Sequence, residues 1–90
     1  MPNFDDITTL VAAEEFDKAI EALKKALAED GDNAEAWYLL GKAYWRKGER
    51  SEAMSCYAKS VALDPDSPAG YALEQARDIA NFFNPDLLNP

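Results

Sequence analysis

Apolar residues recur along this chain at intervals of three and four positions, the spacing of one face of an α-helix. The pattern is clearest at 16–29, where Ile20, Leu23 and Leu27 alternate with charged residues. Short polar stretches rich in Asp, Asn, Gly and Pro interrupt this periodicity. The sequence therefore predicts an all-α fold with about five helices, at roughly 4–13, 16–29, 34–47, 50–63 and 67–82.

Two of the predicted helices, together with the polar turns that follow them, are similar in sequence. Residues 16–33 align without a gap on residues 50–67, a shift of 34 positions. Apolar positions are kept in this alignment, and the identical pairs are Ala19/Ala53, Lys25/Lys59, Ala28/Ala62, Asp30/Asp64 and Asp32/Asp66. Because 34 residues is the period of a helix-turn-helix repeat, we expect antiparallel helix hairpins stacked side by side.

The segment 34–67 carries the signature residues of one such repeat. They are Trp37, Leu40, Gly41 and Tyr44 in its first helix, Gly48 at the turn, Ala53 and Tyr57 in its second helix, and Pro65 after it. On these residues the segment resembles the tetratricopeptide repeat family. The resemblance implies a short right-handed solenoid formed by a single domain, residues 1–83. Within it, 16–33 is a partial first repeat, 34–67 a full repeat and 68–83 a capping helix, followed by a tail at 84–90.

Several signature residues have predictable structural roles. Gly41 and Ala53 are small where two helices must approach closely. Gly48 can adopt the positive φ that ends a helix, and Asn33 is a good N-cap for the helix that starts at Ala34. These positions predict both the helix boundaries and the crossing point of the hairpin.

The segment departs from the family pattern at two positions. Arg50 replaces the usual aromatic residue at the start of the second helix, and Ser60 replaces the usual second alanine. We expect either looser packing near Arg50 or an arginine stem that covers apolar surface while its charge reaches water.

The net charge of the chain limits the classes of molecule that it is expected to bind. The chain has 17 Asp and Glu against 9 Lys and Arg, a formal net charge of -8. This acidity argues against nucleic acid and anionic membranes as partners. No apolar run approaches the roughly 20 residues of a membrane span, and the start of the chain lacks the pattern of a secretory leader. We therefore expect a cytoplasmic protein.

The sequence offers little for catalysis or metal binding. Histidine is absent, and Cys56 is the single cysteine, without a histidine to activate it. The Asp30–Asn33 stretch resembles the start of a calcium loop, but the later ligand positions fall on residues such as Ala34 and Gly41. Carboxylate pairs lie in predicted turns, where they remain solvated. We expect no enzymatic activity, no metal and no cofactor.

In the tetratricopeptide repeat family, the first helix of each hairpin lines a concave groove. The resemblance places ligand contacts at Glu35, Tyr38, Lys42, Trp45 and Arg46. Four of these, Tyr38, Lys42, Trp45 and Arg46, form a basic-aromatic strip on one side of the helix and are the candidate peptide-binding residues. The alternative is that the two aromatic rings pack against the neighbouring helices. The two cations are then solvated or paired with nearby acids such as Asp78 or Glu49.

Two functions follow from these expectations. The first is a non-enzymatic protein–protein interaction module that binds a peptide or protein segment in a short concave groove. The second is a self-assembling scaffold, a homodimer formed through the solenoid ends or through the apolar tail containing Leu87 and Leu88.

Overall fold

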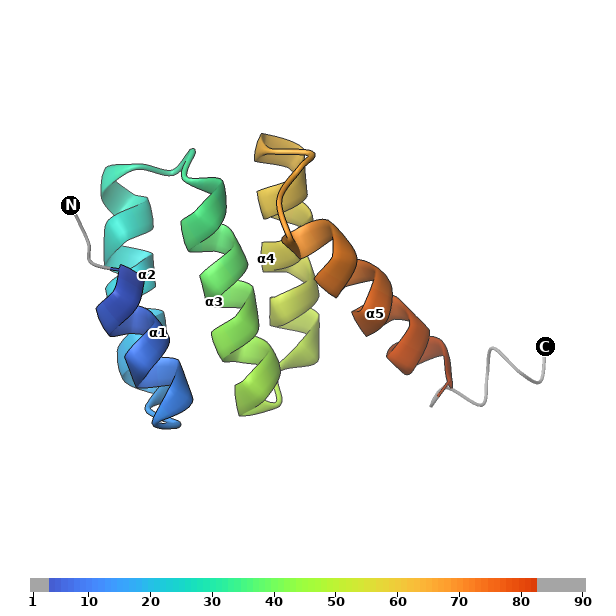
Figure 1. The fold of residues 1–90 in the computed structure, drawn as a ribbon, viewed down its shortest axis with the longest axis horizontal. Coiled ribbons are helices and arrows are strands. Elements are labelled where there is room, and N and C mark those ends of the chain that lie inside the picture. The colour runs from blue at the N-terminus through green and yellow to red at the C-terminus, as the bar shows by residue number, and fades with distance from the viewer. Residues whose placement is uncertain (1–3, 83–90) are drawn as a thin grey trace.

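The computed structural model describes the backbone of residues 4–82 and the side chains of residues 5–76. The described residues form five α-helices, which are α1 (Phe4–Ala12), α2 (Phe16–Glu29), α3 (Ala34–Lys47), α4 (Arg50–Leu63) and α5 (Ala69–Phe82) (Figure 1). The all-α prediction is confirmed, and the predicted bounds of α2, α3 and α4 agree with those observed. The tail at 84–90 lies outside the described residues.

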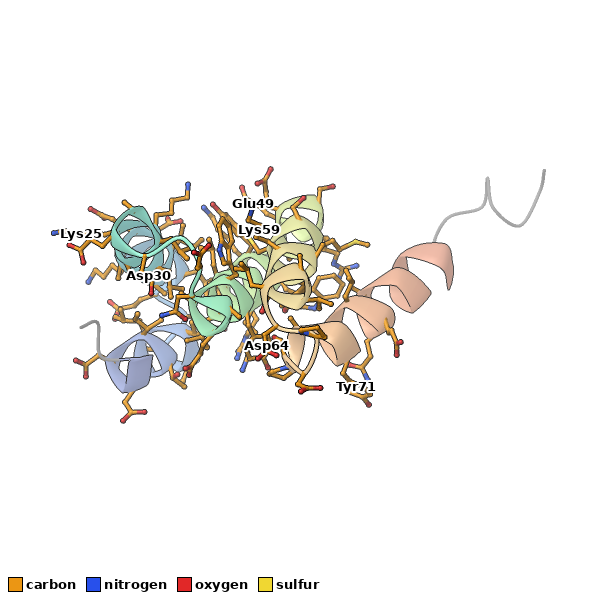
Figure 2. All side chains as sticks on the ribbon, turned by 90° about the horizontal axis from the view of Figure 1, so that it is seen from above. Lys25, Asp30, Glu49, Lys59, Asp64 and Tyr71 are labelled. Atoms are coloured by element: carbon orange, nitrogen blue, oxygen red, sulfur yellow. The ribbon has the colours of Figure 1, made fainter. Side chains whose placement is uncertain are left out.

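The helices run alternately up and down, and each packs against the next along the chain (Figure 1). Seen from above, α2 and α4 lie on one side of the molecule, whereas α1, α3 and α5 lie on the other (Figure 2). The helix α3 is therefore central, in contact with α2 and α4 and to a lesser extent with α1. This position gives α3 two sides on which hollows between helices can form.

The crossing of α3 and α4 depends on Gly41. A Cβ atom at this position would lie 2.6 Å from two ring carbons of Tyr57 and 3.2 Å from the carbonyl oxygen of Ala53. Tyr57 is itself buried, so a Cβ atom at position 41 would force its ring out of its packed position. The expected close approach at Gly41 and Ala53 is thus confirmed. The core around it is made mainly of small and branched apolar residues from all five helices, among them Ile7, Leu23, Leu40, Ala53 and Leu73.

The start and end of α3 follow the sequence prediction. The Asn33 side chain accepts a hydrogen bond from the backbone N–H of Ala36, at 3.1 Å, and so caps the helix. At the other end Gly48 has a φ of +99° and donates its N–H to the carbonyl of Trp45. These local interactions fix the length of the helix and the direction of the chain on each side of it.

The turn after α1 repeats the geometry of the turn after α3, without a glycine. Glu14, 34 positions before Gly48, has a φ of +63°. Its N–H donates to the Val11 carbonyl at 3.0 Å, and the Glu15 N–H donates to the Leu10 carbonyl at 2.8 Å. This left-handed conformation is strained for a residue with a Cβ atom. The conformation was not predicted, because glutamate is rare in this role.

Both departures from the family pattern have a structural explanation. The guanidinium of Arg50 lies over the ring of Trp45, 4.7 Å from its centroid, so the arginine covers an aromatic surface of α3. Ser60 is fully buried and donates a hydrogen bond of 2.7 Å to the Ala34 carbonyl. Its hydroxyl also lies 2.7 Å from that of Ser67. Ser67 in turn accepts the N–H of Ala69, which is why α5 begins two residues later than predicted.

Candidate functional site

A hollow of about 300 Å³ lies between α3 and α5, on the side of the molecule formed by α1, α3 and α5. Tyr38, Lys42 and Trp45 of α3 form one wall. The residues that complete it are Tyr57 of α4, Pro68, and Tyr71, Ala72, Gln75 and Ala76 of α5. The aromatic and alkyl groups in this set give the hollow an apolar floor, with a single ammonium group at its margin.

A second hollow of about 300 Å³ adjoins the first. The two share Tyr38 and Pro68 in their linings, so they lie next to each other along α3, and we term the pair of hollows the α3/α5 groove. The second hollow is lined by Ala34, Glu35 and Leu39 of α3 and by Asp64 and Ser67 at the end of α4. Its charged members are both acidic, in contrast to the lysine in the first hollow.

The structure brings three of the four predicted strip residues together in the groove and separates the fourth. Tyr38, Lys42 and Trp45 line the first hollow, and the Lys42 ammonium lies 5.7 Å from the centroid of the Tyr38 ring. Arg46 does not line either hollow, because its guanidinium lies over the ring of Phe16 on α2, at 5.8 Å. Helical spacing alone could not distinguish the two sides, since Phe16 belongs to a different hairpin.

The aromatic rings of the strip are half-buried, so each of the two sequence interpretations describes part of their environment. One side of Tyr38 packs against Tyr57, with ring centroids 6.1 Å apart, and Trp45 is covered in part by Arg50. Their other surfaces line the groove. Burial also raises the pKa of Tyr57 to about 12, an effect to which the neighbouring Tyr38 contributes. Tyr57 is therefore a neutral phenol at physiological pH.

Sequence reasoning missed the wall that α5 contributes. Among the described side chains of α5, Tyr71 is an exposed large hydrophobic residue with 69% of its surface accessible, and Pro68 and Gln75 lie on the same wall. One signal was available, because a shift of 34 positions from Trp37 leads to Tyr71. The rest of the repeat signature has faded in α5, so no further positions could be assigned to the groove.

A larger hollow, of about 580 Å³, lies on the other side of α3, between α2 and α4. Lys24 and Lys59 are at its margin, each about 6 Å from the ring of Tyr44 and Trp37, respectively. The Trp37 indole N–H donates to the Gly31 carbonyl, which fixes the ring. Lys59 and Tyr71 project on opposite sides of the molecule (Figure 2). The two depressions are thus independent surfaces.

Chemically reactive groups are scarce in the described residues. Cys56 lines the larger hollow, and burial, reinforced by Glu52, raises the pKa of its thiol to about 11. The thiol is thus protonated and a poor nucleophile at neutral pH. No group of three or more His, Cys, Asp or Glu side chains within the described part of the chain could hold a metal ion. None of the described helices is long and apolar enough to cross a membrane.

Comparison with known proteins supports the assignment of the fold. The chain is 34% identical to a Bacteroides fragilis protein of known solution NMR structure, with a TM-score of 0.88 over 99% of this chain and 91% of the other. It is 42% identical over 50 residues to cellulose synthase operon protein C of Escherichia coli K12, and 42% identical over 44 residues to human tetratricopeptide repeat protein 5. These matches cover 56% and 49% of this chain but only 4% and 10% of the two relatives.

The family model of the tetratricopeptide repeat matches residues 10–77, which include the end of α1, all of α2, the full repeat and the first part of α5. Repeats of this family generally mediate protein–protein interactions and are typically non-catalytic. The matched residues include the signature positions whose packing is described above. The chain therefore belongs to the tetratricopeptide repeat family.

Proposed function

We propose that this chain is a non-enzymatic interaction module whose α3/α5 groove binds an extended segment of a partner protein. The proposal rests on one observation: Tyr38 and Lys42 of α3 and the exposed Tyr71 of α5 line opposite walls of the same hollow. A partner that is neither nucleic acid nor membrane belongs to the same proposal and rests on the net charge of -8. A cytoplasmic location belongs to it as well, as the sequence pattern led us to expect.

The dimensions of the groove suit a peptide. Along α3 it extends from Glu35 to Trp45, about 15 Å at the rise of an α-helix. An extended chain covers this length with four or five residues. Each hollow has a volume at the lower end of the range of small ligand sites, which fits the side chains of a peptide better than a large cofactor.

The groove side chains supply both contact area and polarity. Tyr38, Trp45 and Tyr71 present large rings that lose little conformational entropy on binding, as rings at protein interfaces commonly do. Lys42 is the cation within the first hollow and would pair with a carboxylate of the ligand. Arg46, on the ring of Phe16, is removed from this role and would act only at the margin of the groove.

The proposal can be tested by selecting peptides from a displayed library on the wild-type protein. Tyr71→Ala and Lys42→Glu should each weaken binding of the selected peptides at least tenfold, a difference of about 1.4 kcal/mol. Because Tyr71 is exposed, its truncation should leave the helical circular dichroism spectrum and the melting temperature unchanged. Lys25→Glu is the matched control, since Lys25 projects from α2 away from the groove (Figure 2). Equal binding by Tyr71→Ala and the wild type would overturn the proposal.

The exposure of Tyr71 also favours the second function, in which a second copy of the chain covers the same surface. The tail residues that would take part in such a dimer lie outside the described residues. Sedimentation across a dilution series distinguishes the two functions. A monomer at all concentrations excludes self-assembly, whereas a dimer that dissociates in Tyr71→Ala would favour it over peptide binding.

A further inference from the structure

Charges of opposite sign occupy the two halves of the α3/α5 groove. Glu35 and Asp64 line the hollow at the start of α3, and Lys42 lines the hollow further along the helix. Tyr38 and Pro68, which both hollows share, lie between these charges. The groove is therefore acidic at one end, basic at the other and apolar in the middle.

These charges are free to meet a ligand. Among the side chains that the structure describes, none forms an ion pair with Glu35, Asp64 or Lys42. One oxygen of Asp64 accepts the backbone N–H of Asp66, which leaves the second oxygen available. The Lys42 ammonium lies 5.7 Å from the centroid of the Tyr38 ring, and no described side chain accepts a hydrogen bond from it.

The separation of the charges matches one ligand conformation. Glu35 and Lys42 are two turns apart on α3, roughly 10 Å along the helix axis. In a β-strand, residues three apart span this distance but point to opposite sides. In a polyproline II helix, residues three apart lie on the same side and are about 9 Å apart. Of these two conformations, only the second directs two ligand charges three positions apart into the groove together.

The aromatic walls point to the same conformation. Polyproline II segments are recognised by grooves lined with aromatic rings, because the rigid segment has little entropy to lose. Tyr38, Trp45 and Tyr71 provide such rings, and Pro68 adds a flat apolar surface between them. The floor is thus suited to the prolines of a ligand, and the ends are suited to its charges.

We propose that the ligand of the groove is a polyproline II segment in which a basic and an acidic residue are three positions apart. The basic residue lies at Glu35 and Asp64, the acidic residue lies at Lys42, and two apolar residues such as prolines cover Tyr38. This inference rests on the proposed function and adds the conformation and charge spacing of the partner segment. The charges determine in which direction the segment runs along α3. A segment with the basic residue first and one with the acidic residue first can therefore both bind, in opposite directions.

The test uses hexapeptides blocked at both ends and titrated into the labelled protein at low salt, with binding followed by NMR. The central four residues are Arg-Pro-Pro-Glu, Glu-Pro-Pro-Arg, Arg-Pro-Pro-Arg, Glu-Pro-Pro-Glu or the neutral Gln-Pro-Pro-Gln. We expect at least one of the two mixed-charge peptides to bind about tenfold more tightly than the other three. In Lys42→Glu both ends of the groove are acidic, so the preference should pass to Arg-Pro-Pro-Arg. In Lys25→Glu it should not change.

Equal affinity of all five peptides, or an unchanged preference in Lys42→Glu, would overturn this inference. Either result leaves the proposed function standing if Tyr71→Ala still abolishes binding of the library-selected peptides. Conversely, if Tyr71→Ala binds those peptides as tightly as the wild type, the α3/α5 groove is not the binding site. A peptide with its charges two positions apart, Arg-Pro-Glu-Pro, checks the spacing, and binding as tight as that of Arg-Pro-Pro-Glu would also contradict the inference.

Discussion

The hydroxyl of Ser60 lies 2.7 Å from the hydroxyl of Ser67, and this contact joins three helices. Ser67 accepts the Ala69 N–H at the start of α5, and Ser60 donates to the Ala34 carbonyl at the start of α3. Both serines are buried, so the hydrogen bonds are shielded from water. They set the position of α5 relative to α3, and therefore the width of the α3/α5 groove.

Removal of this link should lower stability. We predict that Ser60→Ala decreases the free energy of unfolding by about 1 kcal/mol, because it removes the bond to the Ala34 carbonyl and the partner of the Ser67 hydroxyl. Ser55→Ala, on the exposed side of the same helix, is the control for the higher helix propensity of alanine. Urea denaturation measures both variants. A Ser60→Ala protein as stable as Ser55→Ala would show that the link contributes nothing.

The close approach at Gly41 gives a second prediction. Gly41→Ala places a methyl group within 2.6 Å of the buried Tyr57 ring, so it should destabilise the protein by about 1–3 kcal/mol despite the better helix propensity of alanine. At Gly70 a Cβ would meet the nearest atom of Val61 at an ordinary 3.7 Å. Gly70→Ala should therefore leave the melting temperature unchanged or raise it slightly. Equal effects of the two substitutions would contradict the packing described here.

The two equivalent turns should respond oppositely to substitution. Glu14→Gly relieves a left-handed conformation and should stabilise the protein by about 1 kcal/mol. Gly48→Ala creates the same strain after α3 and should destabilise it by a similar amount. Thermal unfolding of both variants measures these changes. A loss of stability in Glu14→Gly would mean that the carboxylate side chain has a role that outweighs the backbone strain.

Burial of Cys56 and Tyr57 predicts a loss of stability at high pH. Burial raises the pKa of the thiol from 9.0 to about 11 and that of the phenol from 10.0 to about 12. The fold favours the neutral thiol and phenol. Their contribution to the free energy of unfolding is therefore complete below the ordinary pKa values and is lost as the pH rises through the raised pKa values of the folded protein. The free energy of unfolding should therefore decrease above about pH 9.

A variant can separate the two groups. In Cys56→Ala the decrease should begin only above about pH 10, the range set by Tyr57. Urea denaturation of both proteins at a series of pH values gives the comparison. Superimposable pH profiles would show that the thiol is not perturbed. Alkylation with iodoacetamide at pH 8 adds an independent measure, since Cys56 should react much more slowly in the folded protein than in urea.

The sequence was sufficient to predict the helices and the central crossing, because Gly41, Ala53 and Gly48 match a repeat signature in which each residue has a defined structural role. It was insufficient where a side chain contacts a residue that the signature does not assign. The position of Arg46 depends on Phe16, and the role of Ser60 depends on Ser67, neither of which a helical pattern places. Only half of the groove was predicted, because α5 contributes Tyr71 without the signature of a repeat.

The most direct test of the account is an NMR map of the backbone amides that shift when a library-selected peptide binds. We predict shifts along Tyr38–Trp45 of α3 and Tyr71–Ala76 of α5, the two walls of the groove. The larger hollow on the opposite side, bounded by Lys24–Ala28 and Glu52–Lys59, should be unaffected. Shifts concentrated in those two segments instead would contradict the proposed site and assign binding to the other side of the molecule.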